Sequence, residues 1–490
     1  GTELGYLEAG WALSERRQYG PSAEMLEEAM ARQPNRPEAA ILLGLLELQS
    51  GRDLNALAAL RRVAELDPFN ARAVNSLELI EELVTYDTIE TEHFVIRYKP
   101  GVDEVLAREM PDVLERIHER VTGAANGGID HEPSQKTVIE LMPNHAWFAV
   151  RIAGMPQLHT IAAATGPVIA MEAPKVGPGH KVGAYDWRRT MQHEYVHTVT
   201  LSRTDNRLPH WFTEAAAQYL EDAPRDERTC RLLATKLAAG ELFDMDEINI
   251  RFTRPRNPED RSLAYAQGHW MYEFMVERFG DDAPRRLMDA YARGEREIEA
   301  MPSELGIDRD DFLSDFTEWA REQAEGWGLG AGDLERVSEL VQRARDAEDG
   351  TEEKVELLLA WAEAVPVAER PHRELVRHFL AQEDPAEQAR AIPHLEFLDA
   401  RAQYTPAFAA ALATRYAESN RFELAMVKAD RAVSSAPFDA DQRELAARIA
   451  LVTQDLETAE RHLDALTRIE PDRPEHAARL ARVQEIMQGR

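Results

Sequence analysis

The chain has very little cysteine: Cys230 is the only one among its 490 residues. A single thiol excludes an intrachain disulfide and a cysteine-rich zinc module, although it does not identify a cellular compartment. Any metal ion in this protein must therefore bind to histidine and carboxylate side chains, and the sequence supplies 15 His and 88 Asp and Glu residues.

Basic residues and long apolar runs are also scarce. The chain has 57 Lys and Arg against its 88 acidic residues, which gives a formal net charge of −31. Such a charge repels a phosphate backbone, so we do not expect nucleic acid as a partner. No apolar run approaches the ~18 residues of a membrane-spanning helix, so no transmembrane segment is expected. At 44% hydrophobic and 30% charged residues, the composition is that of a folded globular protein.

The length predicts two to four structural units, and both ends of the chain carry an internal repeat. Four pairs of small or proline residues are 34 positions apart: Gly10 and Gly44, Pro34 and Pro68, Ala425 and Ala459, and Pro437 and Pro471. Small residues suit the close crossing of two helices in a hairpin, and proline ends the second helix. These features resemble tetratricopeptide (TPR) repeats, without most of the Trp and Tyr of the full pattern. The resemblance implies TPR-like helical arrays over residues 1–84 and 334–490.

The middle of the chain is expected to combine strands and helices. Residues 88–98 are rich in β-branched and aromatic side chains, residues 137–141 and 168–172 are further strand candidates, and the pattern is helical after residue 184. Strands followed by helices predict an α+β domain over residues 85–326. The glycine-rich segment 326–332 marks its end. The expected fold class is thus α+β, with this domain between two all-α arrays.

One segment of the middle region has the pattern of a zinc enzyme. Residues 193–197 read His-Glu-Tyr-Val-His, an HExxH motif within a helical pattern. Residues i and i+4 share one face of a helix, so His193 and His197 can converge on one Zn²⁺. Glu194 can then reach a water molecule on the ion and accept its proton as the water attacks a carbonyl carbon.

A second segment supplies a carboxylate. Residues 208–219 read LPHWFTEAAAQY and place Glu214 early on an alanine-rich helix, 17 positions after His197. Two His and one carboxylate with an open fourth position form the ligand set of a catalytic zinc ion.

Together the two segments resemble the gluzincin metallopeptidases, specifically peptidase-MA-like domains, over about residues 88–325. In these domains HExxH is followed by Leu-Pro-x-Trp-[Leu/Phe]-x-Glu-Gly-x-Ala-x-Tyr. The resemblance implies a thermolysin-like domain with His193, His197 and Glu214 as ligands of one Zn²⁺ per chain and Glu194 as general base. Ala215 replaces the usual Gly of the family, which puts substrate fit near the metal in question.

Further site residues are expected on and after the second motif. Tyr265 and His269 are i and i+4 in a Tyr-x-x-Gly segment that the resemblance includes, and either can donate to the oxyanion of the transition state. Tyr265 is the favoured donor and His269 the second choice. Gln218, one turn after Glu214, is a candidate partner for a ligand. His210 either lines the site or is a partly buried structural histidine.

The leading hypothesis is a zinc metallopeptidase, with endopeptidase activity favoured, whose TPR-like arms bind protein substrates or partners in their grooves. The alternative from another class is a catalytically inactive or shielded peptidase-like TPR scaffold for protein–protein interaction.

A narrower alternative is an aminopeptidase. It depends on the segment Ala170-Met171-Glu172, which resembles an amine-binding Gly-Ala-Met-Glu-Asn element, and on Glu172 holding the substrate amine. The other interpretation of this segment is a plain strand with an exposed acid.

The start of the chain bears on location. It begins at Gly1 rather than Met and lacks the basic-then-apolar pattern of a signal peptide, so we expect a trimmed N-terminus. With a peptidase motif, this favours an exported bacterial protein, whether periplasmic, secreted or tethered to the surface.

Overall fold

The computed structural model describes residues 2–330, 332 and 334–489. Gly1, Arg490 and the part of the glycine-rich boundary at Ala331 lie outside the described residues. Two compact units make up the chain: Gly1–Leu208 with Pro284–Arg296, and Pro209–Ala283 with Glu297–Arg490. The three expected domains, 1–84, 85–326 and 334–490, remain a prediction.

Helices dominate both units, with 67% of the structure helical and 5% in strands. The expected α+β class, with a thermolysin-like domain between two arrays, is therefore wrong. The strand candidates do form strands, but each strand has only 3–6 residues. Beta-branched segments indicate where strands form and say little about how many residues the strands occupy in total.

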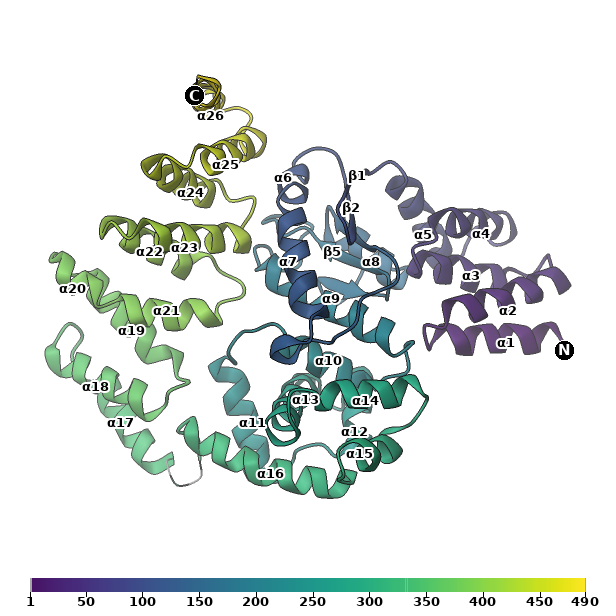
Figure 1. Ribbon diagram of the computed structural model, residues 1–490, viewed down its shortest axis with the longest axis horizontal. Helices are drawn as coiled ribbons and strands as arrows, with labels where there is room; N and C mark the ends of the chain where they lie inside the picture. Colours follow the sequence, from purple (N-terminus) through teal and green to yellow (C-terminus); the bar gives the residue numbers. More distant parts are fainter. Residues whose placement is uncertain (1, 331, 333, 490) are drawn as a thin grey trace. The chain divides into compact units, whose positions relative to one another are not determined.

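The first unit begins with helical hairpins, drawn in purple in Figure 1. Helix α1 packs on α2, and α3 packs on α4. A Cβ atom at Gly10 would lie 2.7 Å from the side chain of Leu26, and one at Gly44 would lie 2.7 Å from Leu60. The expected close crossing at these small residues is confirmed. The helices are α1 (Glu3–Ser14), α2 (Tyr19–Arg32), α3 (Pro37–Gln49), α4 (Asp53–Leu66) and α5 (Ala71–Leu83).

A single five-stranded sheet follows, in the order β1-β2-β3-β5-β4. The inner pairs β2–β3 and β3–β5 are parallel, and the two outer pairs are antiparallel. Ile96, Ile139 and Ile169 are in register across the three inner strands and are all buried, so this row is the centre of the sheet. The strands are β1 (Asp87–Glu90), β2 (Phe94–Tyr98), β3 (Thr137–Met142), β4 (Ala162–Ala164) and β5 (Val168–Glu172).

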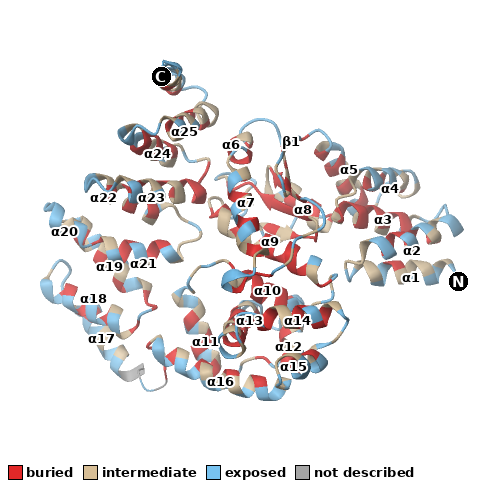
Figure 2. Ribbon diagram, viewed as in Figure 1, coloured by how far each residue is buried: buried red, intermediate tan, exposed pale blue. Residues whose placement is uncertain are grey.

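Helices of the first unit cover this sheet. Helix α8 packs on β3 and β5, and α9 packs on α7, β4 and β5. All residues of β5 are buried, and so is most of α9 (Figure 2). The elements are α6 (Glu104–Ala107), α7 (Met110–Thr122), the short 3₁₀ helix η1 (Ala125–Gly127), α8 (His145–Ala153) and α9 (Trp187–Arg203).

The second unit is helical throughout its described residues. Its first part contains α10 (His210–Tyr219), α11 (Glu227–Ala239), α12 (Met245–Thr253), α13 (Pro258–Phe279), α15 (Glu297–Glu304) and α16 (Arg309–Gly326). Most of α14 (Ala283–Ala292) belongs to the first unit.

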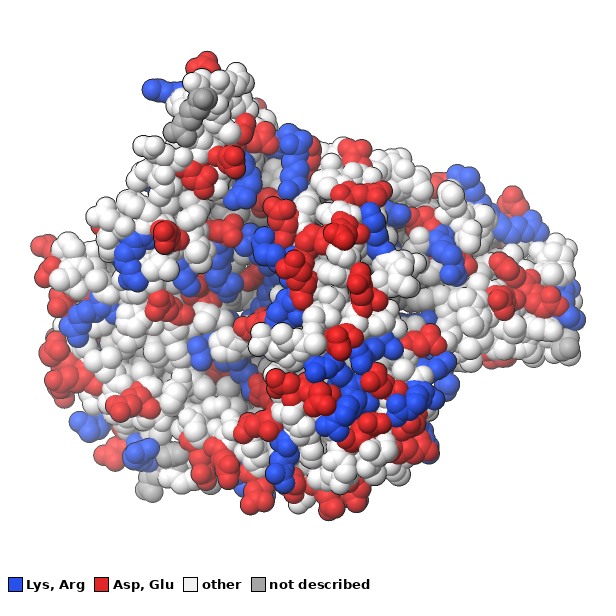
Figure 3. Space-filling model, in the orientation of Figure 1, with Lys and Arg blue, Asp and Glu red and all other residues white. Residues whose placement is uncertain are grey.

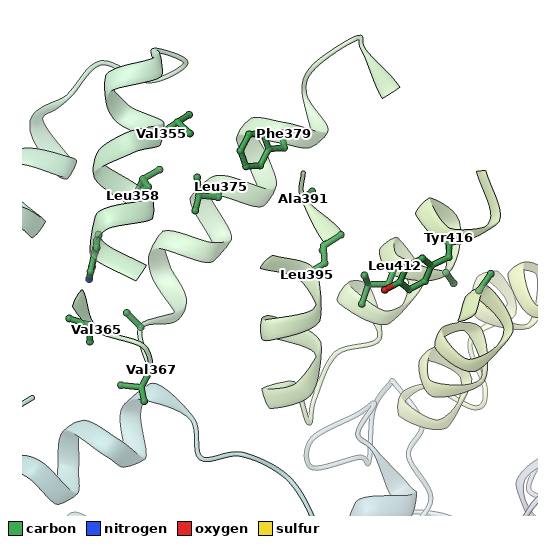
Figure 4. Close-up of a cluster of buried hydrophobic side chains, with 14 of the residues drawn as sticks. Val355, Leu358, Val365, Val367, Leu375, Phe379, Ala391, Leu395, Leu412 and Tyr416 are labelled. Carbon is green, nitrogen blue, oxygen red and sulfur yellow. The ribbon is translucent and has the colours of Figure 1, made fainter. Parts of the chain in front are cut away.

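The second part of this unit consists of packed helices with buried clusters of apolar side chains. Side chains from successive helices, including Leu358, Leu375, Leu395 and Leu412, share one buried cluster (Figure 4). Burial in this cluster raises the pKa of the free Cys230 thiol to about 12. The helices are α17 (Leu334–Asp346), α18 (Glu352–Ala364), α19 (Glu369–Leu380), α20 (Pro385–Ala389), α21 (Ile392–Arg401), α22 (Ala407–Glu418), α23 (Phe422–Ser435), α24 (Ala440–Thr453), α25 (Leu456–Ile469) and α26 (Pro474–Gln488).

Charged side chains cover the surface in mixed order. On the face shown in Figure 3, Lys and Arg are interspersed with Asp and Glu. None of the helices in the described part of the chain is both long and apolar enough to cross a membrane.

Replacing Gly44 with Val should destabilise the α3–α4 hairpin, because the added side chain would overlap Leu60 in a buried position. We expect the local opening free energy to fall by about 1–3 kcal/mol, the usual cost of overpacking a core. Hydrogen exchange of the α3 and α4 amides measures this change. Gly20→Val is the matched control, since a Cβ atom at Gly20 meets nothing within 4 Å. Equal losses in both variants would contradict the packing account.

Candidate functional site

Helix α9 carries the HExxH motif, and its N-terminus is capped by a side chain. The side chain of Asp186 accepts a hydrogen bond from the backbone N–H of Arg189 at 3.3 Å, which caps the helix. Trp187, Met191 and Val199 are fully buried on the helix. This burial fixes the rotation of α9 about its axis and so fixes where its remaining side chains point.

His193 and His197 lie one turn apart on α9, and their imidazoles converge. The two Nε2 atoms are 3.2 Å apart, and the ring planes are inclined by 80°. Two nitrogens bound tetrahedrally to one Zn²⁺ at the usual bond lengths lie about 3.3 Å apart. Glu194 and His197 are buried, and His193 is half-buried. The spacing therefore suits one metal ion, and the role of both residues as ligands stays a prediction.

Glu214 lies on α10 in the second unit and is also buried. His210, one turn earlier, places its Nε2 3.5 Å from Oε1 of Glu214, and the His210 side chain is 43% exposed. The interpretation of His210 as a partly buried structural histidine is therefore wrong.

His193 and His197 belong to the first unit and Glu214 to the second, so the predicted set of three ligands is divided between the two units. Within the first unit, His93, His118 and Glu132 form a further group of His and carboxylate side chains, with ligand atoms within 4.8 Å of one another. This group was not predicted, because its members are far apart in the sequence and form no local motif.

The two oxyanion candidates lie on α13 and have different surroundings. Tyr265 is half-buried, and its ring packs edge-on against the ring of Phe252, with the two ring centroids 4.8 Å apart. His269 is buried, with Nε2 3.3 Å from Oε1 of Glu273, which in turn pairs with Arg225 at 2.6 Å. Burial and the positive charge of Arg225 lower the pKa of His269, although Glu273 opposes them. His269 is thus already paired with charged neighbours.

Helices α10 and α13 approach closely at the glycine of the Tyr-x-x-Gly segment. A Cβ atom at Gly268 would lie 3.5 Å from the carbonyl oxygen of Trp211 and 3.6 Å from Cβ of Ala215. The methyl group of Ala215, where the family has Gly, therefore fits against Gly268. Gln218 is half-buried on the last turn of α10, and its contact with a ligand remains a prediction.

Several residues that position α10 were not predicted. Asn249 accepts a hydrogen bond from the backbone N–H of Trp211 at 3.0 Å, and Glu297 accepts one from its indole N–H at 2.5 Å. Burial raises the pKa of Glu297, although the Trp211 bond opposes this shift. No local pattern in the sequence marks these residues, because each lies far along the chain from Trp211.

Glu172, the candidate amine-binding residue, is 2% exposed at the end of β5. Its Oε2 lies 2.9 Å from Nδ1 of His145. Its Oε1 lies 3.1 Å from Nδ1 of His180 and accepts a hydrogen bond from the backbone N–H of Lys181 at 2.8 Å. The segment does form a strand, as that interpretation expected, but the exposed acid is wrong, because both carboxylate oxygens of Glu172 have partners inside the protein.

Residues 166–322 match the family model of the Peptidase MA superfamily. This range contains α9, α10 and α13, and with them both motifs and the two oxyanion candidates. The predicted resemblance to peptidase-MA-like domains is confirmed for these residues. The wider range 88–325 and the assignment to the gluzincins remain predictions.

Comparison with other proteins adds little to this match. No curated protein sequence matches the chain significantly. Similar solved structures include Naa15/Naa10 bound to HypK-THB, the APC/C hetero-tetramer Cut9–Hcn1, and yeast Tom70. Their identities are 12%, 12% and 11%, and their TM-scores are 0.19, 0.23 and 0.25. The matches cover 98%, 99% and 99% of this chain and 66%, 96% and 90% of those chains, in the same order. Because the TM-scores are so low, these structures support no conclusion about fold or function.

Replacing Glu172 with Ala should destabilise the first unit by about 2–4 kcal/mol, because it leaves His145, His180 and the Lys181 amide without their buried partner. Hydrogen exchange in β5 and residues 173–186 should rise accordingly. If Glu172 instead binds a substrate amine, the variant would keep its stability. It would then lose any preference for peptides with a free amine over their acetylated forms.

Proposed function

We propose that this protein is a zinc-dependent metallopeptidase whose helical hairpins bind protein substrates or partners. The observation that carries the proposal is the 3.2 Å separation of the His193 and His197 Nε2 atoms on a buried helix. The match of residues 166–322, which include His193, His197 and Glu214, to the Peptidase MA superfamily supports it.

His193, His197 and Glu214 would hold one Zn²⁺ per chain. Two neutral imidazoles and one carboxylate leave a net positive charge on the ion and one open position. When bound, the ion supplies Lewis-acid polarisation of the substrate carbonyl and a water molecule of lowered pKa. The donor set therefore fits a catalytic rather than a structural zinc ion.

Glu194 would act as the general base. It follows the first histidine directly and is buried, so its carboxylate is shielded from bulk water. It would accept a proton from the attacking water and transfer that proton to the leaving amine. The reaction would cleave the peptide C–N bond and release a carboxylate and an amine.

Tyr265 is the better of the two candidates for oxyanion stabilisation. Its ring packs on Phe252, which also packs on His210, and His210 lies beside Glu214. His269 Nε2 already contacts the carboxylate of Glu273, so its N–H is less able to donate a hydrogen bond to a substrate oxygen. The engaged carboxylate of Glu172 favours endopeptidase over aminopeptidase activity.

The second candidate is an interaction scaffold in which the peptidase-like region is inactive or shielded. The architecture as a whole favours it, because 67% of the structure is helical and the ends of the chain consist of packed helices. Exposed apolar side chains such as Phe69 and Val452 are of the kind that protein partners bury. The site favours the first candidate, and the helical hairpins serve a binding role in both.

Replacing Glu194 with Gln should leave zinc bound and lower the hydrolysis of a peptide library by at least ~100-fold, since the amide cannot accept the proton. Metal content and the cleavage rate are measured on the same samples. Glu318→Gln is the matched control, because Glu318 is an exposed carboxylate on α16 and its loss should change neither quantity. Undiminished turnover in the Glu194 variant would refute the mechanism. If the zinc-loaded wild type cleaves no library peptide, the interaction scaffold becomes the supported function.

A further inference from the structure

Two histidines in the second part of the second unit are hydrogen-bonded to each other. His372 lies on α19 and His394 on α21, and their Nδ1 atoms are 3.0 Å apart. The ring centroids are 5.0 Å apart, and the ring planes are inclined by 62°. A hydrogen bond between two imidazole nitrogens needs one donor and one acceptor, so one of the two rings must lack a proton on Nδ1. The closed pair can therefore carry at most one positive charge.

His372 also stacks on an aromatic ring that carries a cation. Its imidazole lies parallel to the ring of Phe397, with centroids 3.8 Å apart and planes inclined by 5°. The guanidinium carbon of Arg401 lies 3.8 Å from the centroid of the same Phe397 ring. Two groups at this distance cannot share one face of a ring, so Phe397 lies between His372 and Arg401.

His394 has a similar neighbourhood on the opposite helix. Its imidazole is stacked at an offset on the ring of Phe379 of α19, with centroids 6.0 Å apart and planes inclined by 9°. The guanidinium carbon of Arg390 lies 4.4 Å from the centroid of that ring. The two imidazoles and the two phenylalanine rings thus connect α19 with α21, and each phenylalanine ring carries a guanidinium group.

These surroundings disfavour further protonation of the pair. Burial lowers the pKa of His372 to about 4, and the positive groups of His394 and Arg401 add to this shift. Burial also lowers the pKa of His394, and Arg390 adds to that shift. Cys230 of α11, which interacts with Arg401, has a pKa of about 12 and is uncharged. Other charged side chains on the surrounding helices form pairs of their own: Glu374 with Arg370 and with Lys354 of α18, Glu369 with Arg373, Glu387 with Arg390, Asp399 with Lys428 and Arg431, Glu418 with Arg415, and Glu396 with Tyr416.

We propose that His372 and His394 form an acid-sensitive clasp, which joins α19 to α21 at neutral pH and opens in acid. When the second imidazole takes up a proton, two N–H groups and two positive charges face each other across 3.0 Å, and neither nitrogen can accept a hydrogen bond. Because α18 packs on α19 and α22 packs on α21, the clasp lies at an inner joint of the row of helices.

Opening of the clasp would change the surface of this row of helices. Leu375 and Phe379 of α19 and Leu395 of α21 belong to the buried apolar cluster around the joint (Figure 4). Separation of the two helices would expose these side chains to water and let the helices before α19 move relative to those after α21. The inference does not depend on peptidase activity.

The direction of the pH effect follows from the lowered pKa of His372. With a pKa of ~6.5 in the open form and about 4 in the closed form, the closed form has its full stability above about pH 6.5. This stability is lost as the pH falls toward 4. For His372 alone, the opening equilibrium constant rises by about 30-fold between pH 7.5 and pH 5.

Hydrogen exchange of the full chain at about pH 7.5 and pH 5 tests the clasp. Rates are expressed as protection factors, which removes the intrinsic pH dependence of exchange. We expect the protection of the α19 and α21 amides to fall by about 30-fold in acid. Helices α3 and α4 contain no histidine and are the internal reference, whose protection should change by ~3-fold or less.

His372→Gln should reduce the loss of protection to ~5-fold or less, because the amide can donate to His394 and does not titrate in this range. His372→Phe, which keeps the stacking on Phe397, should give the same result and replaces the Gln variant if that does not fold. His378→Gln is the matched control. His378 is a half-buried histidine of α19 whose ring packs edge-on against Phe379, and its variant should keep the full response.

Three results would overturn the clasp: an equal loss of protection in α3 and α4, a full response that survives in both His372 variants, or a response that the His378 variant loses to the same extent as they do. The measurement uses no added metal or peptide. Its failure would therefore leave the proposed peptidase function untouched, and failure of the peptidase function would leave the clasp untouched.

Discussion

The burial of α9 is the constraint on which the candidate site depends. Apolar side chains along the helix pack against α7 and the sheet, so the helix cannot rotate about its axis without exposing them. Because residues i and i+4 share a face, the same rotation holds the imidazoles of His193 and His197 together. The chemistry of the motif is therefore a consequence of how the rest of the helix packs. Tyr195, which contacts His118, belongs to this packing rather than to the chemistry.

Buried charged groups specify how the first unit is assembled around that helix. Glu140 on β3 and Arg151 on α8 are fully buried and paired at 2.5 Å. Arg97 on β2 contacts Glu140 at 3.5 Å and pairs with Asp53 at the start of α4. A buried ion pair adds little net stability, but breaking it leaves an uncompensated charge, so alternative arrangements of these elements are strongly disfavoured. The network thus ties a helical hairpin to the sheet that α9 packs on.

The sequence predicted those features that depend on short-range periodicity. The i, i+4 spacing of His193 and His197 predicted a helix with convergent imidazoles, and the 34-residue spacing of Gly10 and Gly44 predicted the close helix crossings. The strands were located for the same reason. The share of residues in strands was overestimated. Local patterns indicate where an element forms, but they do not determine the proportion of helix to strand across 490 residues.

Features that depend on the tertiary fold could not be predicted. One interpretation of the sequence predicted that Glu172 is exposed, because its partners His145 and His180 can be recognised only in the folded chain. The His93, His118 and Glu132 cluster is assembled from three separate segments and has no motif. The exposure of His210 could not be predicted either, because it depends on what packs around α10, and its side chain is 43% exposed beside Glu214.

The central claim is that the two histidines of α9 hold a zinc ion. The most direct test is anomalous diffraction at the zinc absorption edge from crystals of the zinc-loaded chain. We expect an anomalous peak about 2.0–2.1 Å from Nε2 of both His193 and His197. A zinc-loaded crystal with no peak between these two atoms would contradict it.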